Sequence, residues 1–210
     1  MKQIPMLLVL GLALSLCNLL NKSKNSGNSS SGSKGSSTSS SSNTTAEKAR
    51  PTAAETAALS GGQEIKWDQQ GISWTIPPKW TKLSDDKNNF LAHSPGGSDA
   101  ANLIGSISTM NDDFPVEASL KATYESNQQR LKHGELDQLR WLEIDGVKGM
   151  QFRESNPEKP DGIRRMQWIA FRQFAGQVQQ VNVILSSSGK GFPGHQDEVN
   201  AVLYSMKLAH

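Results

Sequence analysis

The chain has 210 residues, 35% of them hydrophobic, with 22 basic and 20 acidic side chains and one cysteine. Six of the basic and two of the acidic groups lie in the first 59 residues, so residues 60–210 hold 16 basic and 18 acidic groups, a net charge of −2. This part has no surplus of cations to hold phosphates, which argues against nucleic-acid binding, and a single cysteine excludes an intrachain disulfide.

The N-terminus has the pattern of an export signal. Lys2 precedes an uncharged apolar run, Ile4–Leu20, which is shorter than the roughly 20 residues of a membrane span but fits the hydrophobic part of a secretory signal. Within this run, Leu14–Cys17 resembles the bacterial lipobox, in which a cysteine becomes the lipidated first residue of the mature protein. The sequence departs from that motif at Leu16, where the family prefers a small residue.

Three interpretations of residues 1–21 therefore stay open. Cys17 is lipidated and holds the protein to a membrane surface, or an ordinary signal peptidase cleaves at the small-x-small site Ala13–Ser15, or the segment is an uncleaved anchor. Each of them exports the rest of the chain. We therefore expect a bacterial envelope protein, anchored to a membrane and exposed to the periplasm or the exterior.

Residues 22–60 are predicted to be a disordered linker. From Ser23 to Thr45 almost every residue is Ser, Gly, Asn or Thr, and none is apolar, so this stretch cannot bury anything. Ala46–Leu59 has weak helical character, but Pro51 interrupts it, and we include it in the linker. A flexible chain of this length has a root-mean-square span of about 35 Å, which would let a domain rotate at a distance from the membrane.

Residues 61–210 are predicted to form one globular domain. Its first half has short strands with alternating apolar residues, at Glu64–Trp67, Ile72–Ile76, Asn89–His93 and Asn102–Met110.

A helix is expected to follow over Val116–His133. An aspartate at position 112 or 113 is its predicted cap, and Gly134 is its predicted stop. Its buried stripe is expected to consist of Val116, Leu120, Tyr124 and Leu131.

The second half is predicted to contain two hairpins and a final helix. Asp145-Gly146 is a strong two-residue hairpin signal between the strands Leu139–Ile144 and Val147–Glu154. Ala175-Gly176 joins two longer strands, Ile163–Phe174 and Val178–Ser187, and the final helix covers His195–Met206.

The longer hairpin predicts the architecture. Side chains alternate across a strand, so Met166, Trp168 and Ala170 share one face, and Ile169 and Phe171 share the other. Both faces carry apolar groups and need cover. We therefore expect an α+β fold in which an antiparallel sheet has helices packed on both faces, an α/β/α sandwich.

The same elements resemble a known family. Gly71–Pro77, followed by Trp80, is similar to the opening glycine, alternating apolar residues, proline and tryptophan of PsbP-like domains, and the hairpin Ile144–Gly149 matches their layout. This family includes photosystem PsbP proteins, a Ran-binding import factor and DcrB-type bacterial lipoproteins. The resemblance covers about Glu64–Leu208. It implies the sandwich fold, no general enzymatic activity, and the binding of partner proteins or support of membrane complexes.

The sequence shows no catalytic constellation, and we expect neither a metal nor a cofactor. The four histidines, His93, His133, His195 and His210, are scattered and lack the paired spacing of a metal motif. His195 is closest to other candidate ligands, but the acidic residues after it are typical of a helix entry.

The candidate partner surface rests on three residues. Trp141 is flanked by charged residues, and Arg164 and Arg165 point their guanidiniums to opposite faces of one strand.

Three hypotheses for function follow. The first is an exported, membrane-tethered and non-catalytic binding or accessory domain for an unknown protein or envelope component. The second is a small-ligand or lipid carrier with an apolar pocket between sheet and helix. The third is a hydrolase with a site assembled from distant residues.

Overall fold

A computed structural model describes residues 45–209 of the chain. The predicted export signal, Cys17 and residues 22–44 of the predicted linker lie outside the described residues, as does His210.

Eight strands form one large sheet in the order β1-β7-β8-β9-β10-β6-β5-β4, and three form a small sheet in the order β11-β3-β2. All pairs are antiparallel except β1 with β7. The strands are β1 Glu47–Lys48, β2 Gln63–Trp67, β3 Ile72–Ile76, β4 Thr81–Asp85, β5 Asn89–His93, β6 Asn102–Met110, β7 Leu136–Ile144, β8 Val147–Glu154, β9 Ile163–Phe174, β10 Gln177–Ser188 and β11 Lys207–Leu208.

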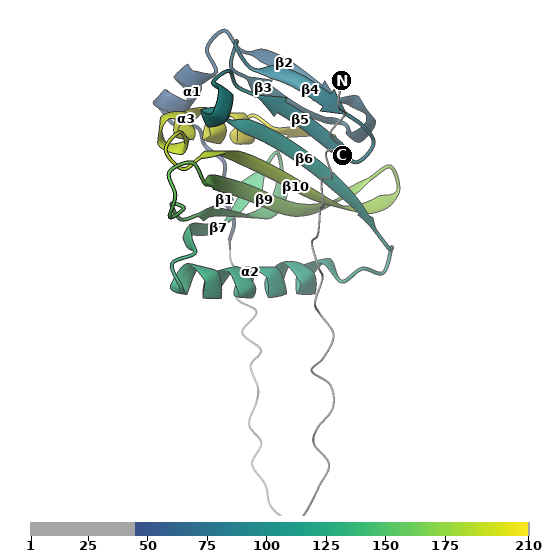
Figure 1. Ribbon diagram of the computed structural model, residues 1–210. Coiled ribbons are helices and arrows are strands. Elements are labelled where there is room, and N and C mark those ends of the chain that lie inside the picture. Colours follow the sequence, from purple (N-terminus) through teal and green to yellow (C-terminus); the bar gives the residue numbers. More distant parts are fainter. Residues whose placement is uncertain (1–44, 210) are drawn as a thin grey trace, which may run out of the picture. The chain divides into compact units, whose positions relative to one another are not determined.

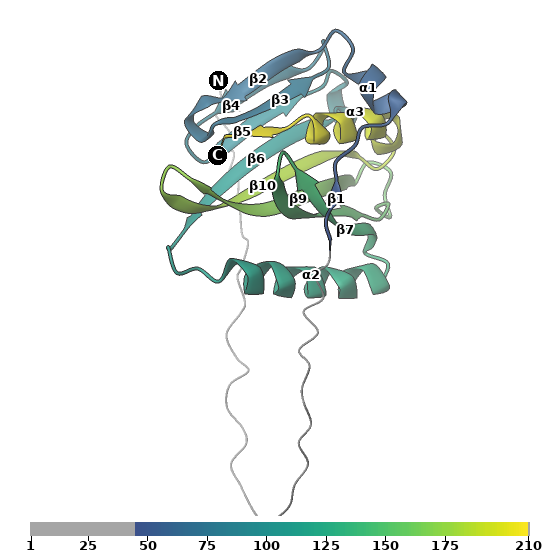
Figure 2. The same cartoon turned by 180° about the vertical axis from the view of Figure 1, so that it is seen from behind.

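Three α-helices complete the structure between residues 45 and 209: α1 Ala53–Ala58, α2 Val116–Lys132 and α3 Phe192–Tyr204. Helix α2 lies along one face of the large sheet, against β7 and β8. Helix α3 and the small sheet lie on the opposite face, and α1 packs beside α3 (Figures 1 and 2). The predicted antiparallel α+β fold with helices on both faces is confirmed.

The central hairpin has the predicted strands, turn and two-sided burial. Ala175 and Gly176 adopt φ angles of +51° and +77° and join β9 to β10. On one face Met166, Trp168 and Ala170 are buried in the main core. On the other face the Phe171 ring stacks on Phe114 with 5.3 Å between centroids. The second hairpin is also confirmed, because Asp145 and Gly146 both have positive φ.

Helix α2 differs from the prediction at its start and along its stripe. Its N-cap is Pro115, which makes no side-chain capping bond, so neither preceding aspartate acts as the predicted cap. Leu131 is 38% exposed and does not belong to the buried side. The buried residue of this helix is Asn127, whose amide lies 3.8 Å from the Met150 sulfur. Gly134, with φ of +76°, ends the helix as predicted.

The end of the predicted linker is folded, which corrects the expected boundary at residue 60. We call residues 47–59 the N-terminal arm. Its strand β1 pairs with Leu142 and Glu143 of β7. The N-cap of its helix α1 is Thr52, whose hydroxyl accepts from the Glu55 N–H while the Glu55 carboxylate accepts from the Thr52 N–H. This reciprocal capping box stabilises a helix of only six residues. The Ser-rich composition around this helix had favoured the prediction of a disordered linker.

Removing the arm should destabilise the domain. Ala49 and Leu59 pack against the main core. A shortened chain that begins at Gly61 lacks these two residues and their apolar burial, whereas a chain that begins at Thr45 keeps both. We expect the shorter chain to unfold with a free energy lower by about 1–3 kcal/mol, measured by urea denaturation of both. Equal stabilities would show that the arm packs only loosely.

Gly149 should resist substitution because of a close approach. A Cβ at this position would lie 2.6 Å from the indole of Trp168 and 2.7 Å from the Ile169 carbonyl oxygen. We expect Gly149→Ala to lower the unfolding free energy by about 1–3 kcal/mol through overpacking. The matched control is Gly194→Ala in α3, where a Cβ meets open space and should leave stability unchanged or raise it by up to about 1 kcal/mol.

Candidate functional site

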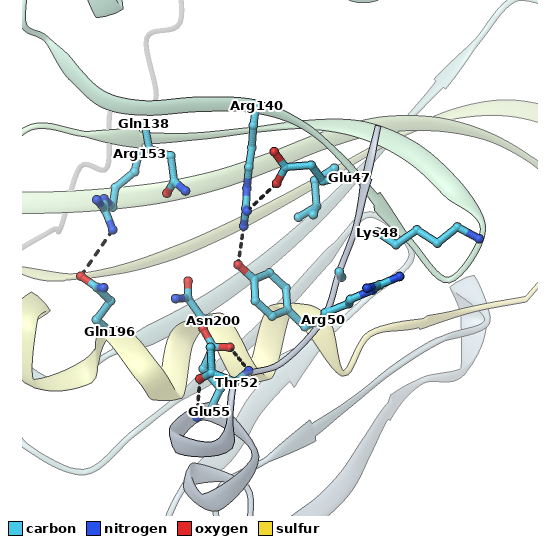
Figure 3. A pocket seen from close by; sticks show the side chains of 13 residues that line it. Glu47, Lys48, Arg50, Thr52, Glu55, Gln138, Arg140, Arg153, Gln196 and Asn200 are labelled. Carbon is cyan, nitrogen blue, oxygen red and sulfur yellow. Dashed lines mark hydrogen bonds and ion pairs between the residues drawn. The ribbon is translucent and has the colours of Figure 1, made fainter. Parts of the chain in front are cut away.

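A polar pocket of about 540 Å³ lies between the N-terminal arm, the β7–β8 hairpin and α3 (Figure 3). Most of the side chains that line it are charged or carry amides or hydroxyls. They are Glu47, Lys48, Ala49, Arg50, Thr52, Glu55, Gln138, Arg140, Leu142, Arg153, Gln196, Asn200 and Tyr204.

The periodicity of two elements brings these side chains together. Alternation along β7 turns Gln138, Arg140 and Leu142 to the face that α3 covers. On α3, Gln196, Asn200 and Tyr204 follow each other at intervals of four residues and therefore lie on one side of the helix. The arm forms the remaining side of the pocket, although its lining residues are more than 80 residues away from those of β7 in the sequence.

Arg140 is the centre of the pocket, because its guanidinium makes three side-chain hydrogen bonds. Its Nε donates to Gln151 Oε1 at 2.6 Å, its Nη1 to Glu47 Oε2 at 3.0 Å and its Nη2 to the Tyr204 hydroxyl at 2.5 Å. Gln151 is fully buried. Burial raises the pKa of Tyr204 above its ordinary value, although the charge of Arg140 opposes this, so the hydroxyl stays neutral at physiological pH.

Arg153, the second guanidinium, is held by other partners. Its Nε donates to Asp137 Oδ1 at 2.6 Å and its Nη1 to Gln196 Oε1 at 3.3 Å. Asp137 also accepts from Arg164. The charge of Arg153 is therefore largely neutralised at the rim of the pocket.

The pocket has more cations than anions. Four basic side chains line it against two carboxylates, and of the two, Glu55 is engaged in the capping box of α1. Lys48 lies 3.7 Å from Glu143, whereas Arg50 is exposed and forms no ion pair within residues 45–209. Glu143 and Asp137, which lie outside the lining, balance Lys48 and Arg153. Arg50 is therefore the lining cation that stays available to an anionic ligand.

The predicted partner residues are not brought together. Trp141 lies on the α2 face of the sheet, where its ring stacks on Tyr124 with 4.6 Å between centroids. Arg164 is only 6% exposed and donates to the Glu154 carbonyl and Asp137. Arg165 is exposed and pairs with Glu154 at 3.3 Å. Their role in partner binding stays a prediction.

The sequence did not predict the polar pocket. Arg140 is one of the charged residues that flank Trp141 in the sequence, and alternation along the strand places its side chain on the face opposite to Trp141. The capping pattern of Thr52 and Glu55 is the sequence signal that could have indicated a folded arm, but it does not indicate that the arm lies beside Arg140.

A second cavity, of about 290 Å³, is lined in part by His195, the histidine that the sequence places closest to other candidate ligands. His195 Nδ1 lies 2.9 Å from Glu198 Oε2, one turn further along α3. Trp80 and three prolines form much of the remaining lining. Across residues 45–209, no group of three or more His, Cys, Asp or Glu side chains is arranged to hold a metal ion. None of the helices of this part is long and apolar enough to cross a bilayer.

No protein-family model and no curated protein matches the sequence. Solved structures match the fold. LpqN of Mycobacterium tuberculosis, described as involved in cell envelope biogenesis, aligns with a TM-score of 0.53 at 13% identity, over 71% of this chain and 92% of LpqN. The cyanobacterial PsbP protein CyanoP of Synechocystis aligns with a TM-score of 0.47 at 12% identity, over 70% and 92%.

A protein from Bacteroides thetaiotaomicron aligns with a TM-score of 0.43 at 14% identity over 71% of this chain, which spans only 49% of that longer protein. Identities this low show the fold and nothing more. The alignment with LpqN shows the fold, and it agrees with the PsbP-like fold that the resemblance in the sequence predicted.

Two substitutions in the pocket should differ in their effect on stability. Arg140→Met removes the Nε donor from the buried Gln151 oxygen and should cost about 1–3 kcal/mol. Glu47→Gln removes only an ion pair whose carboxylate side chain is 64% exposed, and should cost less than about 1 kcal/mol. Chemical denaturation of both variants measures the difference. Equal costs would contradict this assignment of Arg140 as an anchor of the interior.

Proposed function

We propose that this chain is an exported, membrane-tethered and non-catalytic binding domain, which acts by docking a protein or another envelope component. In this proposal residues 1–21 are the export signal or anchor, residues 22–44 are the tether, and the domain begins with the N-terminal arm. The observation that carries the proposal is the polar pocket, which offers cations and amides for recognition.

The chemistry of the pocket favours binding over turnover. A general base or nucleophile needs a partner within hydrogen-bond reach that activates it. Of residues 45–209, no histidine lines the polar pocket, and the carboxylates of the pocket are engaged with Arg140 and the cap of α1. The pair His195 and Glu198 lies in the other cavity, within one helix turn, and a helix-surface pair of this kind supports α3.

The carrier hypothesis has less support. A lipid or apolar ligand needs a largely apolar enclosure, whereas the 540 Å³ pocket is lined mainly by polar groups and the cavity beside Trp80 is only about 290 Å³. An envelope location is consistent with the export signal and with the described role of LpqN.

Site-specific photo-crosslinking in the source cell tests the proposed function. A photoreactive residue is placed in the full-length protein at Gln138 on the pocket rim, at Leu83 on the β4 edge, or at Lys121 on α2. We expect the same protein to be captured in repeated experiments from one of these positions and not from the others. Failure to capture any partner from all three, or turnover of ester, peptide or glycoside substrates by the purified chain, would overturn the proposal.

The anchor needs its own experiment. Metabolic labelling with a fatty-acid analogue should mark the native protein, and Cys17→Ser should abolish the label if Cys17 is the lipidated residue. An unlabelled native protein would exclude lipidation and leave signal cleavage or an uncleaved anchor, which the mass of the mature N-terminus distinguishes.

A further inference from the structure

We propose that the outer edge of β7 and the polar pocket together bind an extended acidic peptide of a partner protein. The peptide adds as a strand beside β7 and places a carboxylate on Arg140, where Glu47 of the arm now lies. This inference rests on the proposed function, because it names the partner chemistry of that binding domain.

The first observation is an open strand edge. On its outer side β7 pairs with β1 only at Leu142 and Glu143. Within residues 45–209 no strand pairs with the outer side of residues 136–141, a length of roughly 20 Å at 3.3 Å per residue. Unpaired N–H and C=O groups along such an edge are a template for strand addition.

Leu139 and Trp141 present their backbone N–H and C=O groups to the open side of β7. The Glu143 carbonyl accepts from the Ala49 N–H of the arm, so the backbone groups of Glu143 point outward. Backbone groups of successive residues turn to alternate sides of a strand. Trp141 and Leu139 therefore present their N–H and C=O groups to the same open side, beside the pocket.

The second observation is the character of the two faces at this edge. On the pocket face, Arg140 offers a positive charge and Gln138 offers an amide (Figure 3). On the opposite face, Leu139 and Trp141 pack with the apolar cluster beneath α2. An added strand has side chains that alternate between these faces. The edge therefore fits a peptide in which acidic residues alternate with apolar ones.

The arm already shows how such a ligand binds. Glu47 is in a strand beside β7 and its carboxylate accepts from Arg140 Nη1 at 3.0 Å. The strand has only two residues, and the Glu47 side chain is largely exposed. An exposed ion pair is worth about 0.2–1 kcal/mol, so a peptide carboxylate can displace Glu47 at little cost. The arm thus acts as a weak internal competitor for the partner.

Calorimetric titration of the full-length protein in detergent micelles tests this. The probe is a blocked heptapeptide of alternating glutamate and valine, and its counterpart has glutamine in place of each glutamate. We expect the acidic peptide to bind at least tenfold more tightly than its counterpart, and backbone amide resonances of Leu139 and Trp141 to shift on binding.

Three variants sharpen the test. Arg140→Gln should weaken binding of the acidic peptide at least tenfold, and Glu47→Gln should tighten it by about 1.5-fold to fivefold, the ratio that corresponds to an exposed ion pair. Lys66→Gln, which also removes a cation from an exposed ion pair but lies in the small sheet, should leave the affinity unchanged.

Three results would overturn the inference. The peptides could bind equally, or Arg140→Gln could bind the acidic peptide as tightly as the native protein does. Glutarate could also bind with the same dependence on Arg140, while neither glutarate nor the acidic peptide shifts the amide resonances of Leu139 and Trp141. That result would show that the pocket binds small anions and that the strand edge takes no part.

If photo-crosslinking still captures a partner with Arg140→Gln, the proposed function stands and only this inference fails. If no partner is captured by the native protein, the proposed function fails regardless of the peptide result.

Discussion

The indole of Trp168 is the contact on which the arrangement of the large sheet depends. This side chain is fully buried on β9, and its Nε1 donates to the Leu142 carbonyl of β7 at 3.1 Å, across the intervening strand β8. The crossing requires Gly149 on β8, because any side chain there would occupy the space of the indole. Three strands are thereby held in one register. The outer strand of the three, β7, is the one on which the arm and the polar pocket are built.

A second constraint joins the two sheets at the other end of the core. Arg172 of β9 is buried and donates from Nη2 to the Gln70 carbonyl at 2.5 Å and to Gln179 Oε1 at 3.1 Å. Within residues 45–209 its hydrogen-bond acceptors are backbone carbonyl and amide oxygens and not carboxylates. Burial lowers the pKa of Arg172 to about 10. A buried cation of this kind is tolerated only when neighbouring groups supply hydrogen bonds. It therefore fixes the turn before β3 against the central hairpin.

The polar pocket combines these fixed elements with a segment that is held less firmly. Arg140 is positioned from within by the buried Gln151 and from α3 by Tyr204. The arm contributes Glu47 through a strand of two residues. A firmly held guanidinium beside an exposed carboxylate on a short strand is an arrangement suited to exchange between an internal and an external partner.

The sequence alone determined the elements whose signals are local. The period-two pattern of residues 163–187, the Asp145-Gly146 turn and the glycine after α2 depend on backbone preferences and alternating burial, and all three are present as predicted. The apolar groups on both faces of β9 also required cover on both sides, which gave the fold class. The boundary of the linker was wrong because a Ser-rich neighbourhood and Pro51 outweighed the local capping signal at Thr52 and Glu55.

Only the tertiary structure decided the site. Arg140 and Glu47 are 93 residues apart in sequence, and no periodicity connects a residue in a strand with one in an apparent linker. The sequence also did not predict the partner of Arg164. Alternation along β9 specifies the face on which Arg164 lies, but it does not specify that Asp137 of β7, two strands away, accepts its hydrogen bond. Contacts of this kind follow from sheet order and from the packing of the arm, which are properties of the whole chain.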